Sequence, residues 1–369
     1  MKQVWEYKKI GNICNITTGK LDANAANEDG LYPFFTCSRI PLSINTYAYD
    51  CECILIAGNG DLNVKYYNGK FNAYQRTYIL QLKNDVNGVE MRYIFAFFNL
   101  YIEELRRKSI GGIIKYIKLG DLTNALLPLP DITTQLTIVS ELDKINELIR
   151  LKQEQLKDYD NLAQSIFYEM FGDPVENEKG WEVKKIGEIG SVERGAGISK
   201  KDFVEDGLPC IHYGQLHTIL GARTKKHYTS IPHDLLPKYK VAHTGDLVMA
   251  ITSEDVEGSC KSTAWLGNYD VIVGSDAAIL HHEQDGTFLS YYTMTKAFYN
   301  EKAKYAKGFK VTHISTKEIE KISVFLPPLP LQHLFAQRIE QIERQKSAVQ
   351  KSITDLETLL ASRMQYWFE

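Results

Sequence analysis

The sequence has no long apolar run, no cysteine framework and no excess of positive charge. No stretch approaches the roughly 18 apolar residues that a membrane-spanning helix requires. The first residues, MKQVWEYKKIGN, carry charges where an export signal has its apolar core. The 6 cysteines lie scattered, which suits a reducing compartment. We therefore expect a cytoplasmic protein without a membrane span.

The formal net charge of −3 counts mildly against a free-standing nucleic-acid binder. Bulk charge decides little, however, because only the face that meets a phosphate backbone has to be basic. The local distribution of charge is therefore more informative than the total.

Motifs that would identify an enzyme are missing as well. Lys20 follows Gly19 without the upstream glycines of a phosphate-binding loop, and Gly195-Ala196-Gly197 lacks the third glycine of a dinucleotide fingerprint. Cys51-Glu52-Cys53 has no second ligand pair for zinc. The adenine-methyltransferase tetrapeptide, Asn or Asp followed by Pro-Pro and an aromatic residue, is absent. We predict a protein that binds rather than catalyses, with no cofactor or metal of its own.

Two long helical patterns dominate what is present. The first follows Leu127-Pro128-Leu129-Pro130 and ends near Pro174, and the second runs from Val324 to Glu369. Apolar residues recur at gaps of three, four and seven, which predicts a coiled-coil seam. Two unrelated helices would not keep this phase, which is shared at an offset of 197 residues. The predicted seam residues are Leu142, Ile145, Leu156 and Leu162 in the first helix and Ile339, Ile342, Ile353 and Leu359 in the second.

The repeat extends beyond the helices. Trp5-Glu6-Tyr7-Lys8-Lys9-Ile10-Gly11 reappears as Trp181-Glu182-Val183-Lys184-Lys185-Ile186-Gly187 at an offset of 176 residues. The second copy has gained residues, mostly between Ser199 and Asp246. We predict an α+β fold of two tandem α/β domains, each followed by a long helix. The two helices would pack as an antiparallel coiled coil with pseudo-two-fold symmetry.

The expected boundaries follow from this pattern. Residues 1–130 form the first domain, 131–174 the central helix, 175–330 the second domain and 331–369 the C-terminal helix. Inside the domains, we expect one helix from Met91 to Arg107 and its counterpart from Thr287 to Lys307.

A basic, glycine-containing segment precedes each proline-rich strand. Because glycine permits close backbone approach and cations neutralise charge, such segments suit phosphate contact. A solvated charged loop is the alternative. Because the segment recurs in both copies, phosphate contact and a solvated loop are equally supported. The candidates are Lys108, Gly111 and Lys115 in the first copy and Lys307, Gly308, Lys310 and His313 in the second.

Polar residues that can read base edges lie on predicted loops and strand ends. We expect them to be exposed, and their divergence between copies is what two different half-sites require. The first copy offers Thr18, Lys20, Asn59, Asn72, Tyr74, Gln75 and Arg76. The second offers Lys200, Lys201, His212, Tyr213, Gln215, Thr252, Ser253 and Ser275.

This layout resembles the specificity (S) subunits of type I restriction–modification systems over essentially the whole chain. The marks are the repeated Trp-Glu motif, Gly111 and Gly308, the two proline-rich strands, and Gln135 and Gln332 before the long helices. One departure is Asp131-Ile132-Thr133-Thr134, where the family passes quickly from proline to glutamine. The departure bears on the cap of the first long helix.

The resemblance implies two domains that each read half of a bipartite, asymmetric double-stranded DNA site. It also implies that the paired helices act as a ruler and dock two modification subunits. Those partners would carry S-adenosylmethionine and methylate adenine, and restriction subunits would join for cleavage.

Two alternatives stay open at this point. The chain could be the specificity subunit of a related system whose single partner both methylates and cleaves. From a different class, it could be a scaffolding protein with no DNA role, which explains the seam but not the divergent polar residues.

Overall fold

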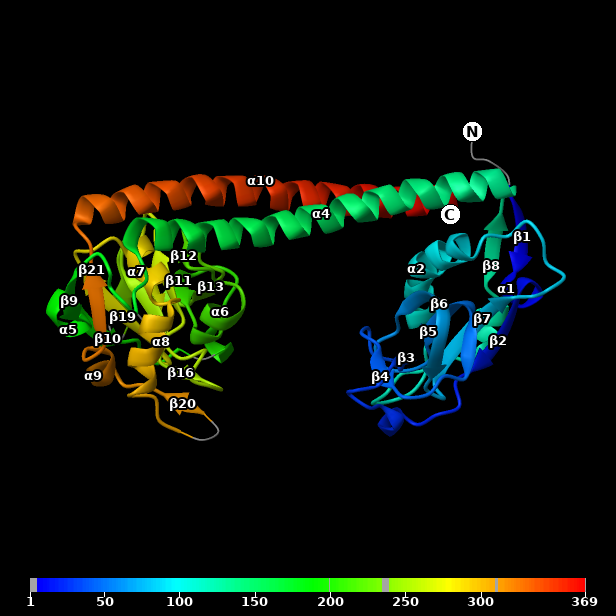
Figure 1. Cartoon of the computed structure of the whole chain (residues 1–369), viewed down its shortest axis with the longest axis horizontal. Coiled ribbons are helices and arrows are strands. Elements are labelled where there is room, and N and C mark those ends of the chain that lie inside the picture. Colours follow the sequence, from blue (N-terminus) through cyan, green and yellow to red (C-terminus); the bar gives the residue numbers. More distant parts are fainter. Residues whose placement is uncertain (1–4, 199, 234–238, 309–310, 369) are drawn as a thin grey trace. The chain divides into compact units, whose positions relative to one another are not determined.

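The computed structural model describes residues 5–198, 200–233, 239–308 and 311–368, which form two compact units (Figure 1). The first unit comprises Met1–Glu154 and Gln350–Glu369, and the second comprises Gln155–Val349. Each unit therefore contains one globular part and a portion of both long helices.

The first unit is built on a six-stranded sheet in the order β2-β7-β5-β6-β3-β4, covered by helix α2. Its elements are β1 (Glu6–Lys9), α1 (Ile10–Ile13), β2 (Cys14–Thr18), η1 (Ala23–Ala25), β3 (Tyr32–Phe35), β4 (Leu42–Ile44), β5 (Tyr49–Ala57), β6 (Val64–Ala73), β7 (Thr77–Leu82), α2 (Met91–Lys108), α3 (Leu119–Thr123), β8 (Leu126–Leu129) and α4 (Ile132–Phe171).

Both faces of the central strand β5 are buried. Ile54 and Ile56 pack toward α2, whereas Cys53 and Leu55 pack on the opposite face against Phe71. Because side chains alternate along a strand, this burial explains why the sequence reads Cys-Ile-Leu-Ile-Ala without polar interruption.

The second unit divides its strands between a five-stranded sheet, β10-β19-β15-β17-β12, and a four-stranded sheet, β13-β11-β18-β14. Its elements are β9 (Glu182–Lys185), α5 (Ile186–Ile189), β10 (Gly190–Arg194), η2 (Lys200–Asp202), β11 (Leu208–Ile211), α6 (Tyr213–Thr218), β12 (Arg223–Thr224), β13 (Thr229–Ile231), β14 (Lys240–Ala242), β15 (Leu247–Ala250), β16 (Thr252–Ser253), β17 (Ser262–Trp265), β18 (Val271–Val273), β19 (Ala277–His282), α7 (Gly286–Tyr292), α8 (Lys296–Ala303), β20 (Thr312–His313), α9 (Thr316–Ile319), β21 (Ser323–Leu326) and α10 (Leu329–Phe368).

The repeated motifs pair with each other in the same register in both units. Strand β1 runs antiparallel to β8 with Glu6 opposite Leu129, and β9 runs antiparallel to β21 with Glu182 opposite Leu326. The Trp-Glu motif and the proline-rich strand, which are far apart in the sequence, therefore form one two-stranded ribbon at the base of each globular part. The predicted α+β fold with two duplicated domains and paired long helices is confirmed.

A buried glutamine fastens each long helix to its globular part. Gln135 donates from Nε2 to the carbonyl oxygens of Gly88 (3.0 Å) and Pro130 (2.8 Å), and its Oε1 accepts from the Glu90 N–H (2.9 Å). Gln332 repeats this with Pro327 O (2.8 Å) and the Asp285 N–H (3.0 Å). Glu90 and Asp285 are the N-cap residues of α2 and α7.

The two long helices pack along a buried apolar stripe within each unit. In the second unit, Asp160 pairs with Lys346 and Phe171 contacts Phe335, so the helices run antiparallel there. Of the predicted seam, the following are buried: Leu142, Ile145, Ile339, Ile342 and Ile353.

The seam prediction is wrong at Leu162 and Leu359, each 46% exposed, while Leu156 is half-buried. Ala163 and Leu360 point inward instead. The buried stripe is offset by one residue, which is about 100° around a helix, from the heptad positions assigned to these leucines.

Two other local predictions meet the structure differently. The single helix expected from Thr287 to Lys307 is two helices, α7 and α8, because Thr295 caps a new helix by accepting from the Phe298 N–H (3.4 Å). The departure at Asp131 supplies a cap for α4: its carboxylate accepts from the N–H (3.0 Å) and hydroxyl (2.7 Å) of Thr134.

Candidate nucleic-acid interface

In the first unit, the loops that follow β2 and β6 meet at one edge of the sheet. The Gly19 N–H donates to Thr77 O (3.1 Å), and the Gln75 N–H donates to Leu21 O (2.9 Å). A Cβ on Gly19 would overlap the carbonyl oxygen of Ala73, so only glycine permits this approach. The predicted residues Thr18, Lys20, Tyr74, Gln75 and Arg76 therefore lie together, all exposed except the half-buried Tyr74.

The turn between β5 and β6 lies next to the loops that follow β2 and β6, at the same edge of the sheet. The Gly58 N–H donates to Arg76 O (2.8 Å), the Ile117 N–H donates to Gly58 O (3.0 Å), and Asn59 forms an antiparallel bridge with Tyr116. The Gly60 N–H donates to Lys115 O (3.0 Å). Asn59, Arg76 and the basic segment thus form one continuous surface.

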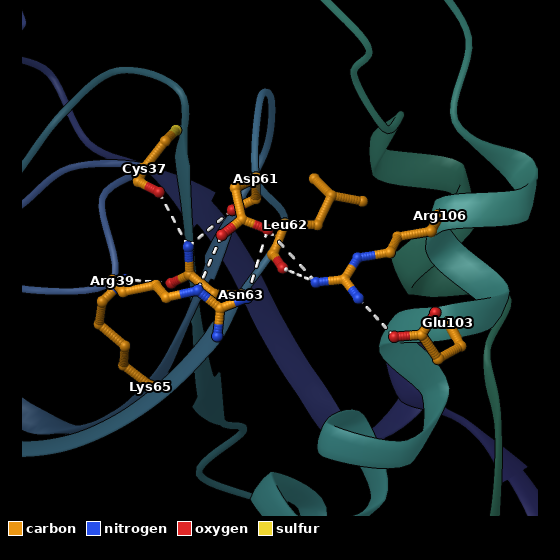
Figure 2. A network of polar contacts seen from close by, with 8 residues as sticks. All are labelled: Cys37, Arg39, Asp61, Leu62, Asn63, Lys65, Glu103 and Arg106. Atoms are coloured by element: carbon orange, nitrogen blue, oxygen red, sulfur yellow. Dashed lines mark hydrogen bonds and ion pairs between the residues drawn. The ribbon is translucent and has the colours of Figure 1, made fainter. Parts of the chain in front are cut away.

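Figure 2 shows that Asp61 holds this turn in place. Its carboxylate accepts from Arg39 Nε (2.8 Å) and from Arg106 Nη2 (3.4 Å), and Arg106 also donates to Leu62 O (2.8 Å). The hydrogen bond from Arg39 lowers the pKa of Asp61. Asn63 adds bonds to the carbonyl oxygens of Cys37 and Asp61, both 2.8 Å. The turn is therefore tied to α2 and to the loop after β3.

Two predicted residues of the first copy have other roles. Asn72 is buried, so the expectation that it is exposed is wrong; its side chain accepts from the Ala73 N–H (3.1 Å) and donates to Thr46 O (3.5 Å). Lys108, at the end of α2, is exposed and pairs with Glu104 (3.3 Å) and the Tyr101 hydroxyl (3.0 Å). The hydrogen bond that Lys108 donates to the Tyr101 hydroxyl raises the pKa of Lys108.

The second unit places several predicted residues around a cavity of about 1040 Å³. His217 bonds to Thr252 O (3.1 Å), and Lys261 donates to His217 O (3.2 Å). The predicted residues that line the cavity are Tyr213, Thr252 and Ser253. His313 pairs with Thr252 across the β16–β20 ribbon.

A buried lysine supports this cavity. Lys302 donates to the carbonyl oxygens of Glu257 (2.7 Å) and Ser259 (2.6 Å), and burial lowers the pKa of its ammonium group. Lys302 therefore anchors the loop between β16 and β17.

Other predicted residues of the second copy lie elsewhere. His212 and Gln215 are buried, so the expectation of exposure is wrong. The His212 ring accepts from the Gly214 N–H (3.2 Å), and the backbone N–H of His212 donates to Gln215 Oε1 (2.9 Å), so the two side chains cap α6. Lys200 and Lys201 are exposed on η2. Ser275 follows β18, where its carbonyl accepts from Arg194 Nε (2.8 Å). Lys310 lies outside the described residues.

The same backbone bridge closes the basic segment in both units. Ile110 forms an antiparallel bridge with Tyr116, and Lys307 forms one with His313; the partners are six positions apart in both pairs. Gly111 has φ 120° and Gly308 has φ 118°, a conformation that disfavours side chains. Lys307 also pairs with Glu318 (2.5 Å), and this bond lowers the pKa of Glu318 to about 2.

Sequence reasoning missed three features of this interface. The contacts of Arg39 and Arg106 with Asp61 have no counterpart among the described residues of the second copy of the repeat, and no sequence pattern around Lys302 indicates that this lysine is buried. Gly19, however, recurs as Gly195, whose N–H donates to Ala277 O (2.9 Å), and this repeat could have been found from the offset of 176 residues.

Neither a metal site nor a membrane span emerges from the part of the chain that the structure describes. Within it, no three His, Cys, Asp or Glu side chains cluster so that they could hold a metal ion. Nor does any helix there have the length and apolarity to cross a bilayer. The six cysteines are free thiols.

The chain matches the sequence profile described as "Type I restriction modification DNA specificity domain" twice, over residues 2–158 and 178–358. It is similar to the type I restriction enzyme EcoDI specificity subunit of Escherichia coli, with 26% identity over 379 residues that cover 95% of this chain and 84% of the relative. The MjaVIII specificity subunit of Methanocaldococcus jannaschii is 23% identical over 401 residues, which cover 96% and 92% of the two chains.

Solved structures share the fold. The type I restriction–modification S subunit from M. genitalium superposes with a TM-score of 0.57 at 14% identity, covering 99% of this chain and 96% of the other. A chain from a structural study of complex assembly and conformational transition of the type I R-M system gives a TM-score of 0.57 at 19% identity, covering 99% and 97%.

Proposed function

Because the chain belongs to the type I restriction–modification DNA specificity family, we propose that its two units each read one half of a bipartite, asymmetric DNA site. The family is non-catalytic, and the chain is a specificity subunit rather than an enzyme. A scaffolding protein with no DNA role is therefore excluded.

One observation supports the proposal: the two units share their structural framework, but the polar residues on the adjoining surface differ. The paired ribbons, glutamines and basic hairpins recur in register. The surfaces beside the hairpins differ, with Lys20, Gln75 and Arg76 in the first unit and Tyr213 and Ser253 around a cavity in the second. Reading two different half-sites requires the same framework in both units, to position each one on the DNA, and different polar residues in each unit, to contact different bases.

The division of labour along the chain is part of the proposal. Residues 1–130 and 175–330 would recognise DNA, and residues 131–174 and 331–369 would pair as a pseudo-symmetric ruler. The helices would also dock two modification subunits, which bind S-adenosylmethionine and methylate adenine, and restriction subunits would complete the complex. A single fused methyltransferase–nuclease partner is the alternative, and the neighbouring gene product distinguishes the two.

A pair of variants tests separate reading. Methylated adenines are mapped in cells that carry the modification partner and either Gln75→Ala with Arg76→Ala, or Lys200→Ala with Lys201→Ala. We expect the first variant to relax one half of the motif and the second to relax the other, so each is the control for its counterpart. Relaxation of both halves by either variant would contradict separate reading.

A further inference from the structure

The hairpin of the first unit presents apolar side chains to solvent at its tip. Ile113 is fully exposed and Ile114 is 62% exposed, and Ile113 is the most exposed large apolar side chain in the described chain. Exposed isoleucines are common singly, but two adjacent ones at a projecting tip indicate a surface that is covered in use.

The tip rests on a firm base. Ile110 and Tyr116 exchange backbone hydrogen bonds (3.0 and 2.8 Å), and Gly60 and Gly58 bond to Lys115 and Ile117. The Asp61 clamp fixes that turn in its place (Figure 2). The segment that carries the isoleucines is therefore tied at its base to the turn after β5, which contains Asn59.

The surroundings of the tip favour a polyanion as the occupant. Residues 109–118 contain Lys115 and Lys118 and no acidic residue. Within the described chain, neither lysine side chain forms an ion pair, whereas Arg107 and Lys108 pair with Glu104. Two exposed isoleucines followed by two unpaired lysines suit DNA better than a protein, whose stable interfaces bury more than about 1,000 Å².

The second unit shares part of this arrangement among its described residues. Gly308 occupies the place of Gly111, and Val311 in the same hairpin is 54% exposed. Phe309 and Lys310, between them in the sequence, lie outside the described residues.

We infer that the hairpin tip of the first unit is an apolar wedge that inserts between base pairs beside its half-site and bends the duplex. This inference rests on the proposed function and adds a mode of DNA deformation to it. Apolar side chains inserted at a base step partly unstack it, and the flanking cations hold the adjacent phosphates. Ile113 and Ile114 would thereby contribute to specificity through the deformability of the step they enter, without a hydrogen bond to any base.

The test uses the assembled complex of this chain with its modification subunits. The probes are duplexes that carry the mapped site, with 2-aminopurine placed at successive positions along it. Wild-type protein should raise the fluorescence at one step near the first half-site, and Ile113→Ser with Ile114→Ser should abolish that rise. The variant should also bind about tenfold more weakly.

Two controls separate the wedge from its surroundings. Leu31→Ser changes another apolar residue of the first unit, which is 82% exposed and not part of the hairpin, and should leave the fluorescence rise intact. Lys115→Ala should reduce the slope of log affinity against log salt by about 1, whereas the double isoleucine variant should keep the wild-type slope.

Several outcomes would overturn the inference. One is a double isoleucine variant that retains both the fluorescence rise and the affinity. Another is a variant that fails to assemble with the modification subunits, since the tip would then contact protein. If wild-type complex does not prefer the mapped site over a scrambled duplex, the proposed function itself fails, and the wedge falls with it.

Discussion

Gln135 and Gln332 show how one residue type joins a domain to a helix. Each is fully buried and bonds to backbone groups of the preceding proline segment and of the N-cap region of α2 or α7. The sequence marks both by position, yet their role depends on a loop 45 to 47 residues away, which no local pattern indicates.

Gln135→Leu should destabilise the first unit by about 2–4 kcal/mol, because leucine leaves the Glu90 N–H and two carbonyl oxygens unsatisfied in a buried place. The urea midpoint measures this loss. The control is Gln153→Leu, at an exposed position of α4, which should change stability by less than about 0.5 kcal/mol. Equal midpoints for the two variants would refute the fastening role.

Residue exposure is where sequence reasoning fails most often. Asn72, His212 and Gln215 are polar residues near turns, so they were expected on the surface. Asn72 hydrogen-bonds to Thr46 O and to the Ala73 N–H, and His212 and Gln215 form a helix cap. Such contacts depend on the whole fold, which a window of sequence does not contain.

At the scale of elements, the paired helices were predictable because their apolar spacing persists over many turns. Which residues of these helices face the seam was predictable only in part. Leu162 and Leu359, equivalent residues of the two copies, were assigned to the seam but are exposed. Hydrophobicity alone does not tell a seam leucine from its neighbour, and the facing helix decides which one is buried.

The element-scale prediction compares two leucines of the first unit. Leu142→Ala should cost about 2–5 kcal/mol of stability, because its side chain packs in the core shared by α2, α4 and α10. Leu359→Ala should cost less than about 0.5 kcal/mol, because its side chain lies outside that core. Chemical denaturation of both variants checks the difference, and a large loss for Leu359→Ala would contradict the observed phase.

At the scale of the whole molecule, the duplication was readable from sequence because its frame motifs keep their offsets of 176 and 197 residues. That the Trp-Glu motif pairs with the proline-rich strand was not readable, since strand pairing over more than 100 residues leaves no periodic signal. The same framework in each unit then supports loops that differ in sequence between the two units.

The ruler proposal predicts the effect of lengthening both helices. Seven residues inserted after Arg150 and seven after the equivalent Ser347 keep the heptad phase and add about 10 Å. The unspecified spacer of the DNA site should then grow by about 3 base pairs, at about 3.4 Å per base pair. Methylation mapping measures the spacer. An unchanged spacer would contradict the ruler, and insertion into one helix alone, which breaks the pairing, serves as the control.

The central claim is that one chain reads two different half-sites. It is tested most directly by mapping every methylated adenine in the genome of cells that carry the wild-type chain and its modification partner. We predict one motif made of two unlike halves separated by a fixed, unspecified spacer, with the halves about one helical turn apart, roughly 10 base pairs centre to centre. A single contiguous palindrome would contradict this account.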